Sequence, residues 1–333
     1  MRGNKLLLSK FLSIFLTVVV LWFVFSWFLK DAELAQIVQT VQNLSLISLA
    51  LIILSIIFNL WVFQYPYLVT TPGLTFWQAF LVRNTSFAIS NSLPAGGTIG
   101  LGLQYSMLKS FGISSQVVGS TLGISSVWNG LIAFFMPVLG LIALLMAGET
   151  LTGLWQTTII CVAILIFTIF AFIIALRSDT GASKVGSFLN SLINPVRKIF
   201  NKTSIDARVS IISFRKQVID VVLQKWKQIT FTNFMVQIGM FLILLACAVA
   251  LNVSINPLSL FAVFCFGRIG TSIPLTPGGL GTTDVIMATF MQTLGVPAVL
   301  SVSVVLLWRG FFFVPQVLAG AISFFTWQLS RVR

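Results

Sequence analysis

Long apolar stretches dominate this sequence and constrain its fold more than any other feature. Each is long enough to cross the hydrocarbon core of a bilayer, for which a helix needs about 20 residues. Only 8% of all residues are charged, whereas a soluble domain carries about 25%, so lipid must be the main solvent. The six predicted spans are Phe11–Leu29, Leu44–Phe63, Val117–Ala147, Leu154–Leu176, Phe231–Leu251 and Val296–Phe325.

Two further apolar segments are interrupted by proline and glycine. Phe76–Leu93 stops at Pro94-Ala95-Gly96-Gly97, and Pro257–Ile273 stops at the stretch Pro274–Gly281. Proline lacks the backbone N–H and glycine tolerates unusual φ angles, so together they end a helix. The sequence therefore predicts an all-α polytopic membrane protein of about six to eight transmembrane helices, with two broken or re-entrant helix pairs. Two topologies stay open, because the broken segments could be re-entrant or could both cross the bilayer.

Basic residues are unevenly distributed along the chain, whose net charge is +13. The segment Arg177–Gln228 holds ten Lys or Arg and three Asp. Cytoplasmic loops of membrane proteins carry such an excess. We therefore predict a multi-pass protein of the cell membrane, with this segment and both termini in the cytoplasm. Nucleic acid is not expected as a partner, because basic loops between membrane spans more often meet anionic lipid.

The second half of this basic segment predicts a helix. Its apolar residues lie mostly three, four or seven positions apart, as in an amphipathic helix that lies on a membrane surface. A solvated linker with some helix is the alternative. The predicted apolar face consists of Ile205, Val209, Ile212, Ile219, Val222, Leu223 and Trp226.

The two interrupted segments resemble each other. When Pro94 is aligned with Pro277, Gly96 falls on Gly279. Both topologies start the first segment on the cytoplasmic side and the second on the outer side, so the halves would be inverted repeats. Matching breaks in inverted halves point to the binding site of a transporter, although a chance similarity of two Pro-Gly kinks is the alternative. We predict one membrane domain, 1–333, made of a first half (1–176), the basic cytoplasmic or interfacial segment (177–228) and a second half (229–333).

The sequence lacks the groups that most enzymes use. Histidine, the commonest general base and metal ligand, is absent. The acidic residues are too scattered for a cluster that holds metal ions. The three cysteines are far apart in apolar runs, as small core residues are. We expect no catalytic residue, no metal and no cofactor, and a protein that is not an enzyme.

The second interrupted segment also carries a family resemblance. The string PLTPGGLGTTD from Pro274 to Asp284, followed by Leu294-Gly295-Val296-Pro297 and Leu306-Leu307-Trp308-Arg309, resembles the lysylphosphatidylglycerol synthase transmembrane-region family. Its pattern is a PGGLG turn, then an acidic residue, a Gly-Val pair and an Arg in the last helix. The resemblance implies a flippase-type membrane domain in its stand-alone form, without the aminoacyltransferase domain of the full synthases.

This chain departs from the family pattern at three places. Asp284 stands where the family usually has Glu. Thr98–Leu101 is uncharged where Glu and Arg often follow the first glycines, and Ser126-Val127-Trp128 stands where an acidic residue and an Arg often pair. These departures imply a different headgroup chemistry.

Charged residues inside apolar segments predict a binding site. An Arg in hydrocarbon costs at least about 2.5–3.5 kcal/mol, so it normally faces a partner or a wet cavity. Arg268 and Arg309 lie near the second interruption, where Asp284 is the only acid. This predicts one salt bridge and a surplus positive charge that a lipid phosphate could neutralise. Arg83 precedes the first interruption and would add a third cation. The alternatives are structural arginines, with Arg268 reaching the interface and Arg83 acting as an interfacial anchor.

The glycines of the interruptions complete the predicted site. Half-helices that begin after Gly97 and Gly281 would direct free N–H groups at an anion, whereas a tight turn packed against another helix is the alternative. The predicted substrate-binding residues are Arg83, Asn91, Pro94, Gly96, Gly97, Lys109, Arg268, Pro277, Gly278, Gly279, Gly281, Thr282, Asp284 and Arg309.

These features together predict a lipid flippase or translocase, or a lipid-binding transporter-like protein, that acts on anionic phospholipid or lipid-linked headgroups. One alternative is a small-solute or ion transporter. Another is a non-transporting membrane scaffold for enzymes of envelope or glycolipid synthesis. The expected partners are membrane lipids with anionic headgroups, together with a second copy of the chain or a membrane enzyme.

Overall fold

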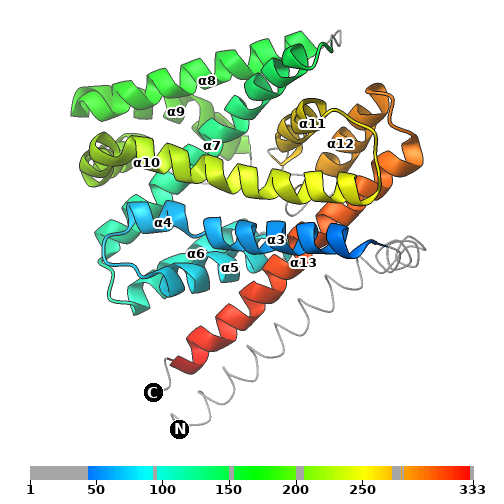
Figure 1. Ribbon diagram of the computed structural model, residues 1–333. Helices are drawn as coiled ribbons and strands as arrows, with labels where there is room; N and C mark the ends of the chain where they lie inside the picture. The colour runs from blue at the N-terminus through cyan, green and yellow to red at the C-terminus, as the bar shows by residue number, and fades with distance from the viewer. Residues whose placement is uncertain are drawn as a thin grey trace.

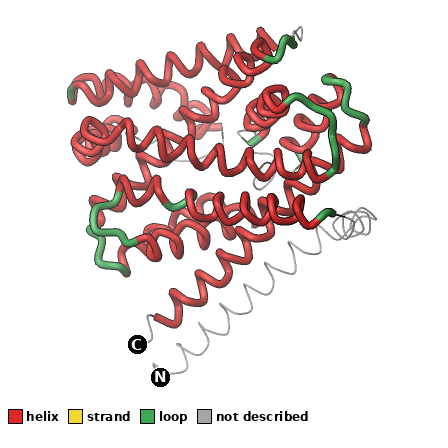
Figure 2. Tube along the Cα trace, viewed as in Figure 1, coloured by secondary structure: helices red, strands yellow, loops and turns green. Residues whose placement is uncertain are grey.

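The computed structural model describes residues 44–92, 96–149, 154–199, 206–271, 279 and 281–330. Every regular element in these ranges is helical, as Figure 2 shows. The predicted first span, Phe11–Leu29, lies outside the described residues. The helices are α3 (Leu46–Val62), α4 (Tyr65–Thr70), α5 (Phe76–Ser92), α6 (Gly96–Ser110), α7 (Ser115–Met146), α8 (Leu154–Arg177), α9 (Asp179–Ile199), α10 (Ala207–Ala250), α11 (Pro257–Gly270), α12 (Thr282–Thr293) and α13 (Ala298–Ser330).

Five helical stretches of the described chain are long and apolar enough to cross a membrane. They are α3 with α4 (Leu46–Thr70), α7, α8, α10 and α13. Each coincides with one of the spans predicted from the sequence, which confirms the all-helical, multi-span class. Large apolar side chains on their outer faces are exposed, for example Ile159 and Phe170 on α8, as expected where lipid is the solvent.

The long helices form layers. Figure 1 shows α8, α10 and α3 running side by side, while α7 and α13 cross them obliquely. The shorter helices fill the spaces between the layers, since α5 packs against α13 and α11 packs against α7. The largest core cluster lies where α7, α10, α11 and α13 meet, and it contains the fully buried side chains of Trp308, Phe264 and Ile243.

Both interrupted segments form helical hairpins. In the first, α5 ends at Ser92 and α6 begins at Gly96; a Cβ at Gly96 would collide with the Ile89 carbonyl oxygen of α5. In the second, α11 ends at Gly270 and α12 begins at Thr282, and the two glycines of α11 that face α12 allow close contact. In each pair the two helices are thus separate and pack against each other, while residues 93–95, 272–278 and 280 of the predicted breaks lie outside the described residues. The longest of these four helices has 17 residues, about 25 Å at 1.5 Å per residue, less than the roughly 30 Å of a hydrocarbon core.

The basic segment continues directly into a predicted span. Its second half is the beginning of α10, a single helix of 44 residues that continues through the predicted span Phe231–Leu251. The predicted helix is therefore confirmed, but it joins the following span without a break, because nothing between Ala207 and Ile238 is a proline or glycine that could end the helix. Val218 and Val222 are buried against α7 and α8, so this half packs on protein along one face. Its other face remains exposed.

One close helix crossing gives a direct test of this architecture. A Cβ at Gly320 of α13 would lie 2.6 Å from the Ala88 Cβ of α5, and closer still to the Asn84 carbonyl oxygen. Gly320→Ala is therefore expected to lower the free energy of unfolding by about 1–3 kcal/mol, because α5 and α13 must separate. Thermal unfolding in detergent micelles measures this effect.

The matched control is Gly310→Ala in the same helix. No heavy atom lies within 4 Å of a Cβ at Gly310. This change should leave stability unaltered or raise it by up to about 1 kcal/mol, because alanine favours the helix over glycine. Equal effects of the two substitutions would contradict the crossing.

Candidate functional site

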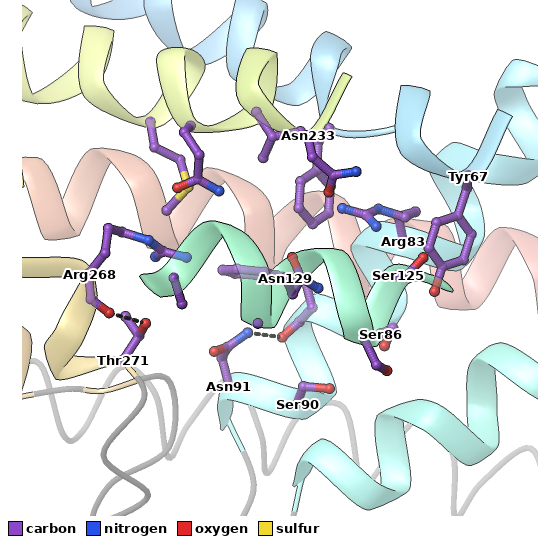
Figure 3. A pocket seen from close by; sticks show the side chains of 18 of the residues that line it. Tyr67, Arg83, Ser86, Ser90, Asn91, Ser125, Asn129, Asn233, Arg268 and Thr271 are labelled. Carbon is purple, nitrogen blue, oxygen red and sulfur yellow. Dashed lines mark hydrogen bonds between the residues drawn. The ribbon is translucent and has the colours of Figure 1, made fainter. Parts of the chain in front are cut away.

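A cavity of about 590 Å³ lies at the centre of the helix packing. Its wall is built from α5, α7, α10, α11 and α13, with contributions from α4 and α6. Figure 3 shows that side chains from these helices point toward one another across it. Three arginines line the cavity, namely Arg83, Arg268 and Arg309. The polar neutral lining residues are Tyr67, Ser86, Ser90, Asn91, Gln104, Ser125, Ser126, Asn129, Asn233, Gln237 and Thr271, and most of the remaining lining is apolar.

Arg309 forms the predicted ion pair with Asp284. Its Nη2 donates to Asp284 Oδ1 at 2.6 Å and its Nε donates to the same oxygen at 2.9 Å. The arginine side chain is only 4% exposed and the carboxylate 19%. Asp284 Oδ2 accepts a hydrogen bond of 2.8 Å from the backbone N–H of Gly281, which caps α12. Both carboxylate oxygens are thus engaged by protein groups, and Asp284 itself does not line the cavity.

Arg268 has no such compensation. It comes from the last turn of α11, and its side chain points into the cavity at one end, next to Thr271 (Figure 3). Its Nε is buried without a hydrogen-bond partner in the described structure. Arg268 also lies close enough to Arg309 for their like charges to repel each other. A buried guanidinium with open donors is a strong site for an anion, because it offers several N–H groups in a fixed fork.

Arg83 occupies the other end of the cavity. Its guanidinium carbon lies 4.1 Å from the centroid of the Phe63 ring and 4.7 Å from that of Tyr67, distances that suit cation–π contact. The Tyr67 hydroxyl donates to Gln104, whose amide donates to Ser86. Arg83 Nε has no hydrogen-bond partner within the described ranges. The two aromatic rings orient the guanidinium of Arg83, and its N–H groups can still donate hydrogen bonds to a ligand.

The cavity therefore carries a surplus of positive charge. Asp179 and Asp206 pair with basic residues of α10, and no acidic residue of the described chain lines the cavity. Three arginines face one engaged carboxylate, which leaves the charges of Arg83 and Arg268 without a protein counter-ion in the described residues. An anion at this site would remove the cost of holding them away from water.

The structure brings together only some of the predicted site residues. Arg83, Asn91, Arg268 and Arg309 line the cavity, and Asp284 is joined to it through Arg309. Pro94, Pro277 and Gly278 lie outside the described residues. The predicted residues that do not line the cavity are Gly96, Gly97, Lys109, Gly279, Gly281 and Thr282.

These outlying residues shape the two hairpins. Thr282 Oγ1 donates to the carbonyl oxygens of Gly270 and Gly279 at 3.1 Å, and thereby holds the second turn. Gly279 has φ +67°, and a Cβ there would lie 2.9 Å from Thr271 Cα. At the start of α12 the carboxylate of Asp284 accepts the Gly281 N–H, a position predicted from the sequence for a substrate anion. Lys109 is exposed at the end of α6.

Several cavity residues were not predicted. Asn233 and Gln237 of α10, and likewise Ser125 and Asn129 of α7, lie four positions apart and line the same cavity. The signal in the sequence was polar residues four apart within otherwise apolar spans, because residues i and i+4 share one helix face. Tyr67 and Gln104 had no comparable local signal, since their hydrogen bond joins two different helices, α4 and α6.

The comparison with known families covers almost the whole chain. The family described as lysylphosphatidylglycerol synthase TM region matches residues 10–320. The chain belongs to this family. The match includes both hairpins and every residue that lines the cavity, so this member of the lysylphosphatidylglycerol synthase transmembrane-region family is a multi-pass membrane protein. In this member the wall that α7 contributes is neutral, with Ser125, Ser126 and Asn129.

A curated relative matches a shorter stretch. Over 89 residues the chain is 30% identical to "Phosphatidylglycerol lysyltransferase" of Staphylococcus aureus (strain MRSA252). This similarity covers 26% of the chain and 11% of that protein. The chain thus corresponds to a small part of this relative's length.

Proposed function

We propose that this protein binds membrane lipids through their anionic headgroups and moves them across the bilayer. The observation that carries the proposal is the pair Arg83 and Arg268, two buried arginines that face one polar cavity and have no counter-ion within the described part of the protein. Ionisable groups among membrane spans are costly, and they normally mark a ligand path. A lipid phosphate offers the planar pairs of oxygens that a guanidinium binds best.

A second, apolar cavity favours a lipid over a small solute. It measures about 850 Å³, lies among α7, α8 and α10, and is lined almost wholly by apolar side chains; of the described residues that line it, Arg177 alone is charged. The helices α7 and α10 contribute to the walls of both cavities. A headgroup in the polar cavity and an acyl chain in this groove would lie on the two sides of the same helix pair.

The contact between α7 and α10 separates the two cavities. Trp128 Nε1 donates to Thr230 Oγ1 at 3.0 Å, and the rings of Phe135 and Phe234 meet edge to face with centroids 5.7 Å apart. These residues lie beside the apolar cavity, and the two helices also meet nearer the basic end of α10, where Ser120 Oγ donates to the Gln217 carbonyl oxygen at 2.9 Å. Separation of α7 from α10 would give a lipid lateral access to the headgroup site, whereas a small hydrophilic solute needs no such groove.

Further support comes from the arrangement of the hairpins and from the family. The first hairpin packs against α13 of the second half through α5, and the second packs against α7 of the first half through α11. Such an exchange is expected of inverted repeats that alternate around a shared site. The name of the staphylococcal relative refers to a phosphatidylglycerol enzyme, which agrees with an anionic phospholipid as substrate. The excess of basic residues in 177–228 supports cytoplasmic termini.

A transport assay with Arg268→Gln tests the proposal. The protein is reconstituted into liposomes that contain a fluorescent phosphatidylglycerol, and the fraction of dye quenched by an impermeant reductant reports movement between leaflets. Loss of one charged contact is expected to slow movement at least about tenfold. Lys109→Gln is the control, because it removes one positive charge from an exposed position outside the cavity. Equal rates for wild type and Arg268→Gln would contradict the proposal and favour a scaffold.

A further inference from the structure

The two cavity arginines that have no acidic partner among the described residues lie at the two ends of the polar cavity. In Figure 3, Arg268 with Thr271 lies at one end and Arg83 with Tyr67 and Ser125 at the other. The side chains labelled between them are uncharged, including those of Asn91, Asn129 and Asn233. Positive charge is thus concentrated at two separated points, and the space between them offers amide and hydroxyl groups.

The number of cavity arginines without an acidic partner indicates how much negative charge the ligand should carry. Arg309 is neutralised by Asp284 through two hydrogen bonds, whereas Arg83 and Arg268 have no acidic partner among the described residues. One phosphodiester carries a single negative charge and would satisfy only one end. A guanidinium that stays buried without a counter-ion remains costly, so occupancy of both ends is favoured.

From this geometry we infer that the preferred headgroup holds two phosphate charges separated by a neutral polyol. Each phosphate would accept hydrogen bonds from one arginine, and the hydroxyls of the linker would meet the amides of the middle wall. The inference rests on the proposed function and narrows its substrate class from anionic lipids in general to lipids with two spaced phosphates.

Three lipids separate the number of charges from their spacing. Diphosphatidylglycerol has two phosphodiesters joined through glycerol, phosphatidylglycerol has one phosphodiester, and phosphatidic acid carries its charge on one phosphate. Binding to the purified full chain is measured by native mass spectrometry with each lipid. Diphosphatidylglycerol is expected to bind at least about tenfold more tightly than the other two, since only it reaches both arginines. Equal binding of phosphatidic acid would show that charge alone decides, and would overturn the inference.

Variants at one end of the cavity test the assignment of Arg83. Arg83→Gln should reduce the affinity for diphosphatidylglycerol to that for phosphatidylglycerol and leave the latter nearly unchanged. Arg83→Lys keeps the charge and should retain part of the preference. A preference that survives Arg83→Gln in full would overturn the two-ended site.

A second substitution tests the inference should Arg83→Gln fail to fold. Asn129→Asp keeps the shape of the side chain and adds one negative charge to the cavity wall. It should weaken diphosphatidylglycerol more than phosphatidylglycerol, because the former carries twice the charge. Asn252→Asp makes the same change in the turn after α10, and it should alter neither affinity. An unchanged ratio in Asn129→Asp would count against the inference.

The results distinguish the two proposals. If no anionic lipid binds in a way that depends on Arg268, the proposed function itself fails. If phosphatidylglycerol binds through Arg268 but diphosphatidylglycerol shows no advantage, only the inference of two spaced phosphates fails.

Discussion

Asp284→Asn is expected to lower the free energy of unfolding by about 3 kcal/mol, because it leaves a buried charge without its partner. Arg309 is 4% exposed and directs two hydrogen bonds at one oxygen of Asp284. Asparagine can still accept the hydrogen bond from Gly281 at the start of α12, so the change removes charge and largely spares the cap. The partial exposure of Asp284, 19%, keeps the expected effect at the lower end of the range for buried pairs. Thermal unfolding in detergent gives the measurement.

Two comparisons make this result specific. Asp220→Asn removes an acid from the exposed face of α10 and should change stability by less than about 0.5 kcal/mol. Asp284→Asn combined with Arg309→Gln removes both charges and should recover much of the loss. A double variant as unstable as Asp284→Asn would show that the ion pair is not the cause.

The double variant Arg83→Gln, Arg268→Gln is expected to reduce transport of diphosphatidylglycerol about a hundredfold or more, since each arginine would supply one phosphate of this lipid with a charge-assisted contact worth roughly 1.5–3 kcal/mol. Its stability should stay within about 1 kcal/mol of the wild type. Loss of cation–π contact at Arg83 lowers stability, but removal of two buried charges without counter-ions raises it. Leaflet exchange in liposomes, normalised to folded protein, measures the first effect, and thermal unfolding the second.

The contrast between the two variants separates binding from folding. Asp284→Asn removes the acidic partner of Arg309. The double variant instead removes Arg83 and Arg268, which have no acidic partner among the described residues. Purely structural arginines would make the double variant unfold while each folded molecule still moves lipid at the normal rate. That outcome would contradict the proposed site.

The sequence predicted the elements that depend on local signals. Pro and Gly marked both interruptions, and the structure ends α5 at Ser92 and α11 at Gly270. The ion pair of Arg309 with Asp284 was also predicted, because only one acid lies near the arginines of the second half. Charged residues are few in so apolar a chain, so the acidic partner of a membrane arginine can be identified when a single acid lies near it in the sequence.

Other features depend on packing and were out of reach. The sequence could not show that Tyr67 and Phe63 would hold Arg83, because these rings belong to a different helix. The sequence also could not show that the basic segment and the span Phe231–Leu251 form one continuous helix. The apolar periodicity before Trp226 did indicate a helix, but only the contacts of Val218 and Val222 with α7 and α8 reveal that it packs on protein. An amphipathic sequence pattern is the same for a separate helix on the membrane surface and for the end of a longer helix that packs on protein, so the pattern does not distinguish them.

The length of α10 has a mechanical consequence. Its 44 residues extend about 66 Å, roughly twice the hydrocarbon thickness of a bilayer. It has no proline, and its first glycine is Gly239, so no residue that commonly kinks a helix lies between its basic end and the cavity. Asn233 and Gln237 of the cavity wall therefore belong to the same uninterrupted helix as Arg208 and Arg215 of the basic end. A tilt of the basic end of α10 would therefore move the part of α10 that lines the cavity.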